Sequence, residues 1–154
     1  MNPADFHSLA DRLVRESGMG GLSPAACRTA VSRAYYAAYN VSVALLDHVG
    51  FATTNVGACH THVQHALMNS GIAILVKVGS NLATLYAERR RADYEMKSPI
   101  AESVVFAAGI VKLAGEMIGT LVSFQNSPPD LKGQLATNVL KYVTDTKPAG
   151  LVRK

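Results

Sequence analysis

The chain has 154 residues, 49% of them hydrophobic, and its 15 Lys and Arg against 11 Asp and Glu give a formal net charge of +4. This length predicts one domain with a single core that buries roughly two thirds of the unfolded surface. The charge favours anionic partners but excludes a polybasic protein. Two cysteines are too few for a disulfide framework, and the N-terminus lacks the pattern of a signal peptide, so we expect a cytoplasmic protein.

Three dipeptides predict helix starts, because each places a capping side chain before a proline at the first helical position. They are Asn2-Pro3, Ser23-Pro24 and Ser98-Pro99. The first helix is expected to run to about Ser17 and the second from Pro24 to about Val49. The second carries an apolar stripe with a spacing of three and four residues. Its members are Val31, Ala34, Ala38, Val41 and Leu45.

The middle of the chain predicts three further helices. A short one covers about Thr61 to Asn69, a longer one Ile72 to about Met96, and a third Pro99 to about Phe124. The apolar run over 103–124 approaches the length of a membrane span. It contains Lys112 and Glu116, however, and each would cost about 2.5 to 3.5 kcal/mol in lipid, so we expect a soluble core helix.

The last part of the chain changes in character. A weak amphipathic helix is predicted from the spacing of Leu131, Leu135, Val139 and Val143, and residues 147–154 are expected to be a disordered basic tail. The sequence shows no repeats, no glycine-rich phosphate loop and no alternating strand pattern. We therefore predict an all-α fold, an antiparallel bundle of four to five helices over 1–126 with an extension over 127–154.

A charged stretch, LYAERRRADYEM at 85–96, follows directly on an apolar helical pattern. Arg89 and Asp93 lie one turn apart on the face that continues this pattern, so both are expected to point inward or into a cleft. Desolvation makes a buried ion pair a poor source of stability. One hypothesis is a groove where Arg89 faces an anion and Asp93 positions it. The alternative is a structural pair that closes the helix, with Arg90 and Arg91 in solvent.

A second stretch, RTAVSRAYYAAYNVSVALL at 28–46, places a polar and aromatic strip beside the apolar one. The strip contains Ser32, Arg33, Tyr35, Tyr36 and Tyr39. Tyrosines on helices usually pack against the core with their hydroxyls hydrogen bonded, so core packing is the simpler interpretation.

Together the segments SRAYYAAYNVSVALL and LYAERRRADY resemble the small stand-alone prokaryotic branch of the HEPN superfamily (higher eukaryotes and prokaryotes nucleotide-binding). Both signatures, Ser-Arg-x-Tyr-Tyr-Ala and Arg-x-x-Ala-Asp-Tyr, occur in order, and the resemblance covers about Pro3 to Phe124. It implies a homodimer with a shared cleft lined by Arg89. It also implies a partner protein similar to a minimal nucleotidyltransferase, in a toxin-antitoxin or defence pair.

Many HEPN proteins are metal-independent ribonucleases whose motif is an Arg, then about four to six intervening residues, then a His. Where that His would stand, this sequence has Tyr94, and no His follows Arg89. A tyrosine, with a pKa of about 10, is a poor general base at neutral pH. The step from Arg89 to Tyr94 is also roughly 140° around an ideal helix, so the two are expected to meet only if the helix breaks or a second subunit helps.

The segment CHTHVQH at 59–65 offers three histidines and a cysteine. A metal site would need three or four converging ligands, and no paired motif is present, so we predict neither a metal nor a cofactor. His60 or His62 is the candidate to supply the missing imidazole to the Arg89 cleft. A nucleophilic pair of Cys59 and His has no third orienting group.

The sequence thus favours a dimeric HEPN protein that binds RNA or a nucleotide, with little or no catalysis. The residues expected to bind phosphate or nucleotide are Arg89, Arg90, Ser32, Arg33 and Tyr36, and those expected for any catalysis are Arg89, Asp93, Tyr94 and His62. Two alternatives stay open. One is a non-catalytic protein-protein interaction module. The other is an active ribonuclease toxin that uses a His from the 60–65 loop.

Overall fold

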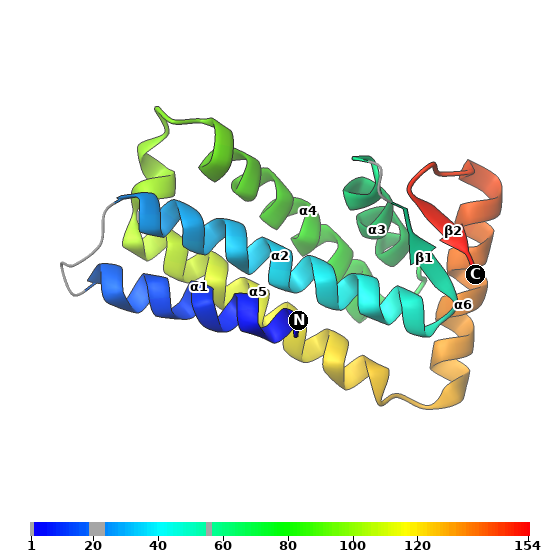
Figure 1. Ribbon diagram of the computed structural model, residues 1–154. Coiled ribbons are helices and arrows are strands. Elements are labelled where there is room, and N and C mark those ends of the chain that lie inside the picture. The colour runs from blue at the N-terminus through cyan, green and yellow to red at the C-terminus, as the bar shows by residue number, and fades with distance from the viewer. Residues whose placement is uncertain (1, 19–23, 55–56) are drawn as a thin grey trace. The chain divides into compact units, whose positions relative to one another are not determined.

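The computed structural model describes residues 2–18, 24–54 and 57–154, and this part of the chain is mostly helical (Figure 1). The α-helices are α1 (Pro3–Gly18), α2 (Pro24–His48), α3 (Cys59–Met68), α4 (Ala73–Tyr94), α5 (Val104–Gln125) and α6 (Pro129–Thr146). A 3-10 helix, η1 (Pro99–Glu102), and two short strands, β1 (Phe51–Thr53) and β2 (Leu151–Arg153), complete the described elements. The predicted all-α fold class is confirmed.

Proline marks two helix starts correctly and a third only in part. Both α1 and α2 begin at the predicted proline, although Ser23 lies outside the described residues. The helix expected from Pro99 is instead η1, and the α-helix begins at Val104. Ser103 causes the change, because its backbone is extended and its hydroxyl accepts a 3.3 Å hydrogen bond from the Phe106 amide. Ser103 is therefore the N-cap of α5.

The described residues pack as two compact units. The first contains residues of Met1–Ala38 and Thr84–Ile118, and the second contains Tyr39–Ala83 and Gly119–Lys154. Helices α2, α4 and α5 contribute residues to both, and α1 belongs to the first unit. Each unit has its own buried apolar side chains. They include Ala10, Val31, Ala34, Tyr35, Leu85, Ala107 and Ala114 in the first, and Leu45, Leu67, Leu75, Leu82, Leu121, Leu135 and Leu151 in the second.

In the first unit, the start of α2 and the end of α4 run antiparallel. Tyr36 contacts Arg89, and about two turns earlier on α2, Arg28 contacts Ala92 further along α4. Helix α1 is fixed to α5 by His7, whose Nε2 lies 3.0 Å from the Val111 carbonyl oxygen. These contacts agree with the antiparallel packing that the sequence predicts.

In the second unit, the chain end is ordered, which corrects the expectation of a disordered tail over 147–154. Strand β2 pairs with β1 in antiparallel register, Phe51 opposite Arg153, and the Leu151 side chain is completely buried. The turn before β2 packs closely on α3, since a side chain at Gly150 would lie 2.6 Å from Cys59 Cα. Backbone pairing and the burial of Leu151 hold β2 in place. The strand has too few residues to show an alternating pattern in the sequence.

Helix α6 also belongs to this second unit. Leu135, Val139 and Tyr142 are buried along one face, and Asn138 Nδ2 donates a 2.7 Å hydrogen bond to the Ser70 carbonyl between α3 and α4. The predicted amphipathic helix is confirmed, although Leu131, expected on its apolar stripe, is 39% exposed.

By length and composition alone, helix α5 could cross a membrane. Core helices of soluble proteins often meet the same two criteria. Its buried positions recur every three or four residues, and Lys112 and Glu116 are both exposed. This one-sided burial is typical of a helix packed on a protein core.

Candidate functional site

The Arg89 guanidinium is held between α2 and α4 in the first unit. Its Nε lies 2.7 Å from Oδ2 of Asp93, and its Nη2 donates a 2.8 Å hydrogen bond to the Tyr36 hydroxyl. The Nε–H itself is aligned with no acceptor in the described part of the chain, so the contact with Asp93 is an ion pair without hydrogen-bond geometry. The Arg89 side chain is 16% exposed. The predicted pairing with Asp93 is confirmed, and the guanidinium is fixed rather than free in solvent.

Rings and guanidinium groups alternate across this part of the unit. The Arg33 guanidinium carbon lies 5.6 Å from the Phe6 ring centroid and 6.0 Å from that of Tyr36. The Arg89 guanidinium carbon lies 5.2 Å from the Tyr36 centroid and 5.4 Å from that of Tyr94. Cations at such distances are attracted to the ring faces. We call these five residues the cation–aromatic ladder.

Within the ladder, Arg89 stays protonated. Burial lowers the pKa of its guanidinium, but attraction from Tyr36 and Asp93 opposes this effect. The nearby Tyr94 side chain adds a hydrogen bond and a further attraction, and the pKa ends above its ordinary value. Arg89 is therefore a permanent cation whose position is fixed before any ligand arrives.

Tyr94 reaches Arg89 within one chain, which corrects the expectation that a helix break or a second subunit is needed. Helix α4 ends at Tyr94, so that residue is free of a following helical turn. The Arg89 side chain is long enough to bring its guanidinium to the Tyr94 ring, although the two residues point in different directions from the helix. Tyr94 is nevertheless 67% exposed, and Arg90 is exposed on the outer side of the helix.

An open hollow of about 370 Å³ lies between the start of α2 and the end of α4. Its lining residues are Ala25, Arg28, Thr29, Ser32, Arg33, Ala92, Asp93 and Met96. Ser32 is buried, and its hydroxyl donates a long 3.5 Å hydrogen bond to Asp93 Oδ2. Asp93 thus joins this hollow to Arg89. Four of the predicted binding residues, Ser32, Arg33, Tyr36 and Arg89, are brought together here.

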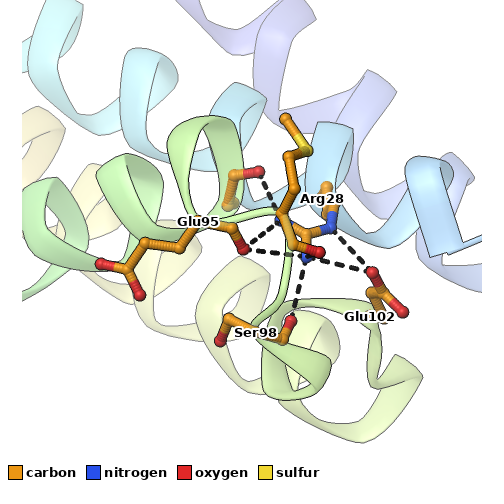
Figure 2. Close-up of polar contacts among 6 residues, drawn as sticks. Arg28, Glu95, Ser98 and Glu102 are labelled. Carbon is orange, nitrogen blue, oxygen red and sulfur yellow. Dashed lines mark hydrogen bonds and ion pairs between the residues drawn. The ribbon is translucent and has the colours of Figure 1, made fainter.

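Arg28, which is not among the predicted site residues, makes the densest set of polar contacts around the hollow. Figure 2 shows its guanidinium surrounded by backbone carbonyls from the end of α4 and the following turn. Nη1 donates to the carbonyl oxygens of Ala92 and Glu95 at 2.9 and 3.2 Å. Nη2 donates to those of Glu95, Met96 and Ser98 at 3.1, 3.2 and 3.0 Å.

A carboxylate completes the environment of Arg28. Glu102 Oε1 on η1 accepts from Nε at 3.2 Å and from Nη2 at 3.0 Å. In Figure 2 the Glu95 side chain points away, and only its carbonyl faces the guanidinium. Every nitrogen of the Arg28 guanidinium therefore has an acceptor within the protein, and Arg28 has no donor left for a ligand.

The end of α4 explains why Arg28 is needed there. In a continuing helix, the amide of Pro99 would donate to the Glu95 carbonyl four residues earlier, but proline has no N–H. The Glu95 carbonyl instead accepts a 3.0 Å hydrogen bond from the Ser98 amide, and Arg28 adds further donors to it from α2. Two features of the sequence point to this contact. One is the Ser98-Pro99 pair after a predicted helix, and the other is Arg28, an arginine on an otherwise apolar face of α2.

The histidines of the 60–65 segment lie in the second unit, where each contacts a tyrosine. His62 Nδ1 lies 3.1 Å from the Tyr142 hydroxyl, and the His65 ring packs edge-on against Tyr142. The His60 ring lies 4.4 Å from that of Tyr39, whose hydroxyl donates to Cys59 Sγ at 3.1 Å. No group of three or more His, Cys, Asp and Glu side chains converges as a metal site among the described residues.

Comparison of this chain with known protein families, with curated proteins and with solved structures finds no match.

Proposed function

We propose that the first unit binds RNA or a nucleotide through its phosphate groups, as its resemblance to HEPN proteins implies. The single observation that carries the proposal is the Arg89 guanidinium, held in place by Asp93 and Tyr36 next to a concave surface. A guanidinium fixed in this way loses little side-chain freedom when it binds an anion. The proposed protein is a homodimer in a toxin-antitoxin or defence pair, with a partner similar to a minimal nucleotidyltransferase.

The three arginines around the hollow, Arg28, Arg33 and Arg89, differ in how far their charges are already neutralised. Arg28 is occupied by the backbone and Glu102, and Arg89 is partly neutralised by Asp93. Arg33 lines the hollow and makes no ion pair with any carboxylate in the described ranges. In the part of the chain that the structure describes, its guanidinium faces the rings of Phe6 and Tyr36 and has no carboxylate within ion-pair distance, so a phosphate would gain most from Arg33. In the proposed complex Arg33 contacts the phosphate directly, and Arg89 strengthens the field behind it.

The test is a titration of the protein with a fluorescent single-stranded RNA at several salt concentrations. Arg33→Ala is expected to weaken binding roughly 10- to 100-fold, because hydrogen bonds to charged groups are worth about 1.5 to 3 kcal/mol. Arg89→Ala is expected to weaken it by a similar factor, because it removes the fixed charge behind the site and leaves Asp93 without its cationic partner. Each should also make binding less dependent on salt.

The matched control is Arg15→Ala, which removes one positive charge from the same unit. The Arg15 side chain is 67% exposed and pairs with Asp11 on α1, away from the ladder residues in sequence and contacts. If Arg15→Ala weakened RNA binding as much as Arg89→Ala, only the net charge would matter, and the proposed site would be wrong.

Ribonuclease activity is a separate and weaker part of the proposal. Tyr94 is exposed, and His60 and His62 already contact tyrosines in the second unit. We expect little or no cleavage of mixed RNA by the purified protein. Efficient cleavage that is abolished by Arg89→Ala would contradict this expectation. Loss of that cleavage in His62→Ala would then identify the base.

A second candidate function, a protein-protein interaction module, has an observation in its favour. Large apolar side chains are exposed close together in sequence at the end of α4, in η1 and at the start of α5. They are Tyr94, Met96, Ile100 and Val105, with exposed fractions from 46% to 83%. RNA binding that is unchanged in Arg33→Ala and Arg89→Ala would favour this function.

A further inference from the structure

Tyr94 ends the cation–aromatic ladder and is its most exposed ring. The inner members of the ladder, Tyr36 and Arg89, are largely covered, whereas Tyr94 is 67% exposed. Its ring lies 5.4 Å from the Arg89 guanidinium, so one side of it is backed by a fixed cation.

A second hollow, of about 600 Å³, opens directly at this ring. It is wide and is lined by Tyr94, Glu95, Met96, Lys97 and Ser98. Met96 is 69% exposed and offers a flexible apolar surface, and Lys97 offers a positive charge. Glu95 adds a negative charge, but it lies 3.8 Å from Arg91, which offsets it. The hollow therefore combines a ring, an apolar wall and a cation.

We propose that this hollow holds a nucleobase stacked on Tyr94, so that the ligand is single-stranded nucleic acid rather than an isolated phosphate. This inference rests on the proposed function. The Tyr94 face is a stacking surface open to solvent, and every base offers a matching face. Lys97 lines the hollow and offers a cation to a sugar-phosphate backbone, and the fixed charge of Arg89 behind Tyr94 adds to the positive field. A base inside a duplex cannot present its face in this way.

Tyr94 is thus a specificity residue in this proposal, and Arg33 and Arg89 supply the charge. The two contributions respond to different ligands. An oligonucleotide with bases uses both the ring and the cations, whereas an abasic oligomer with the same phosphates uses the cations alone. Comparing these two probes separates stacking from electrostatic attraction.

The experiment measures binding of three fluorescent probes to the full chain by anisotropy at low salt. They are a single-stranded adenine decamer of RNA, an abasic decamer, and a duplex of the same length. We expect the adenine decamer to bind the most tightly of the three. Tyr94→Leu should weaken its binding roughly 5- to 150-fold, the effect of losing one stacked base. Tyr94→Phe should restore most of the affinity, because the ring is kept.

For the abasic decamer, Tyr94→Leu should have a much smaller effect than for the adenine decamer. Val122→Ser, which removes an apolar side chain that is 46% exposed in the second unit, controls for the general loss of an exposed hydrophobic residue. It should leave the ranking of the three probes as it is. Circular dichroism of each variant verifies that the helices are retained.

Three results would overturn the inference. Equal losses for the adenine and abasic decamers in Tyr94→Leu would show that Tyr94 acts only by supporting Arg89. No loss for either probe, with Arg33→Ala and Arg89→Ala still weakening both, would exclude stacking and leave the proposed phosphate binding intact. If no probe binds the wild-type protein at low salt, the proposed function fails and the inference fails with it.

Discussion

Replacing Arg28 with methionine is expected to lower the free energy of unfolding by about 4 kcal/mol. The Arg28 side chain is 10% exposed, and methionine would fill its apolar path without the guanidinium. The bond to the Ala92 carbonyl is buried, so leaving that oxygen unpaired costs about 1 to 3 kcal/mol. The carbonyls of Met96 and Ser98 are only partly buried and can bind water, at a smaller cost of roughly 0.5 to 1 kcal/mol each, and the Glu95 carbonyl keeps its bond from the Ser98 amide.

This loss is large compared with a typical domain stability of about 5 to 15 kcal/mol. For a chain of this length, about 2 to 4 °C of melting temperature corresponds to each kcal/mol, so the midpoint should fall by roughly 8 to 16 °C. Urea unfolding followed by circular dichroism gives the free energy directly. Differential scanning calorimetry gives the midpoint.

Two further variants separate the backbone contacts of Arg28 from its ion pair. Glu102→Gln keeps the shape of the acceptor and removes its charge, and Glu102 is 36% exposed. That change should cost no more than about 1 kcal/mol, as for other partly exposed pairs. Arg28→Lys should recover less than half of the lost stability, because an ammonium cannot reach acceptors on both sides of the turn. A loss below about 1.5 kcal/mol for Arg28→Met would refute the reasoning.

Three other changes test the second unit and its packing. Gly79→Ala should cost about 1 to 3 kcal/mol, since the added carbon would lie 2.8 Å from a backbone oxygen of α3; Gly109→Ala, which adds a carbon in open space on α5, should not destabilise the protein. Leu151→Ala should cost about 2 to 5 kcal/mol in urea unfolding, far more than Val152→Ala at the exposed neighbour, and equal losses would contradict the packing of β2. Burial raises the pKa of Tyr142 despite an opposing hydrogen bond, so the folded state holds that proton more tightly than the unfolded state. The contribution of Tyr142 to the free energy of unfolding is present below about pH 10 and is lost as the pH rises through the folded pKa. The free energy of unfolding of Tyr142→Phe should therefore fall less steeply above about pH 10 than that of the wild-type protein.

The sequence predicts the features that depend on neighbouring residues. The starts of α1 and α2, the end of α4 within two residues of Met96, and the pairing of Arg89 with Asp93 all follow from local spacing. Each involves residues no more than four apart, where helix geometry alone determines which side chains meet.

The features that it misses depend on residues far apart in the chain. Phe51 pairs with Arg153, and Arg28 binds carbonyls more than sixty positions later. Periodicity carries no information about such contacts. A strand of three residues is also too short to show alternation, so β2 is indistinguishable from a tail until Leu151 is seen to be buried.

The end of α4 links the stability of the first unit to its proposed ligand. The chain leaves the helix after Tyr94, and the carbonyls of Ala92, Glu95 and Ser98 face Arg28, whose donors are all used within the protein. The same ending leaves Tyr94 without a following turn to cover it, so the ring is exposed and rests on Arg89. If α4 continued for another turn, the Met96 amide would satisfy the Ala92 carbonyl, and Arg28 would have fewer acceptors within the protein. The distinction between a structural and a ligand-binding arginine in this unit therefore depends on where one helix stops.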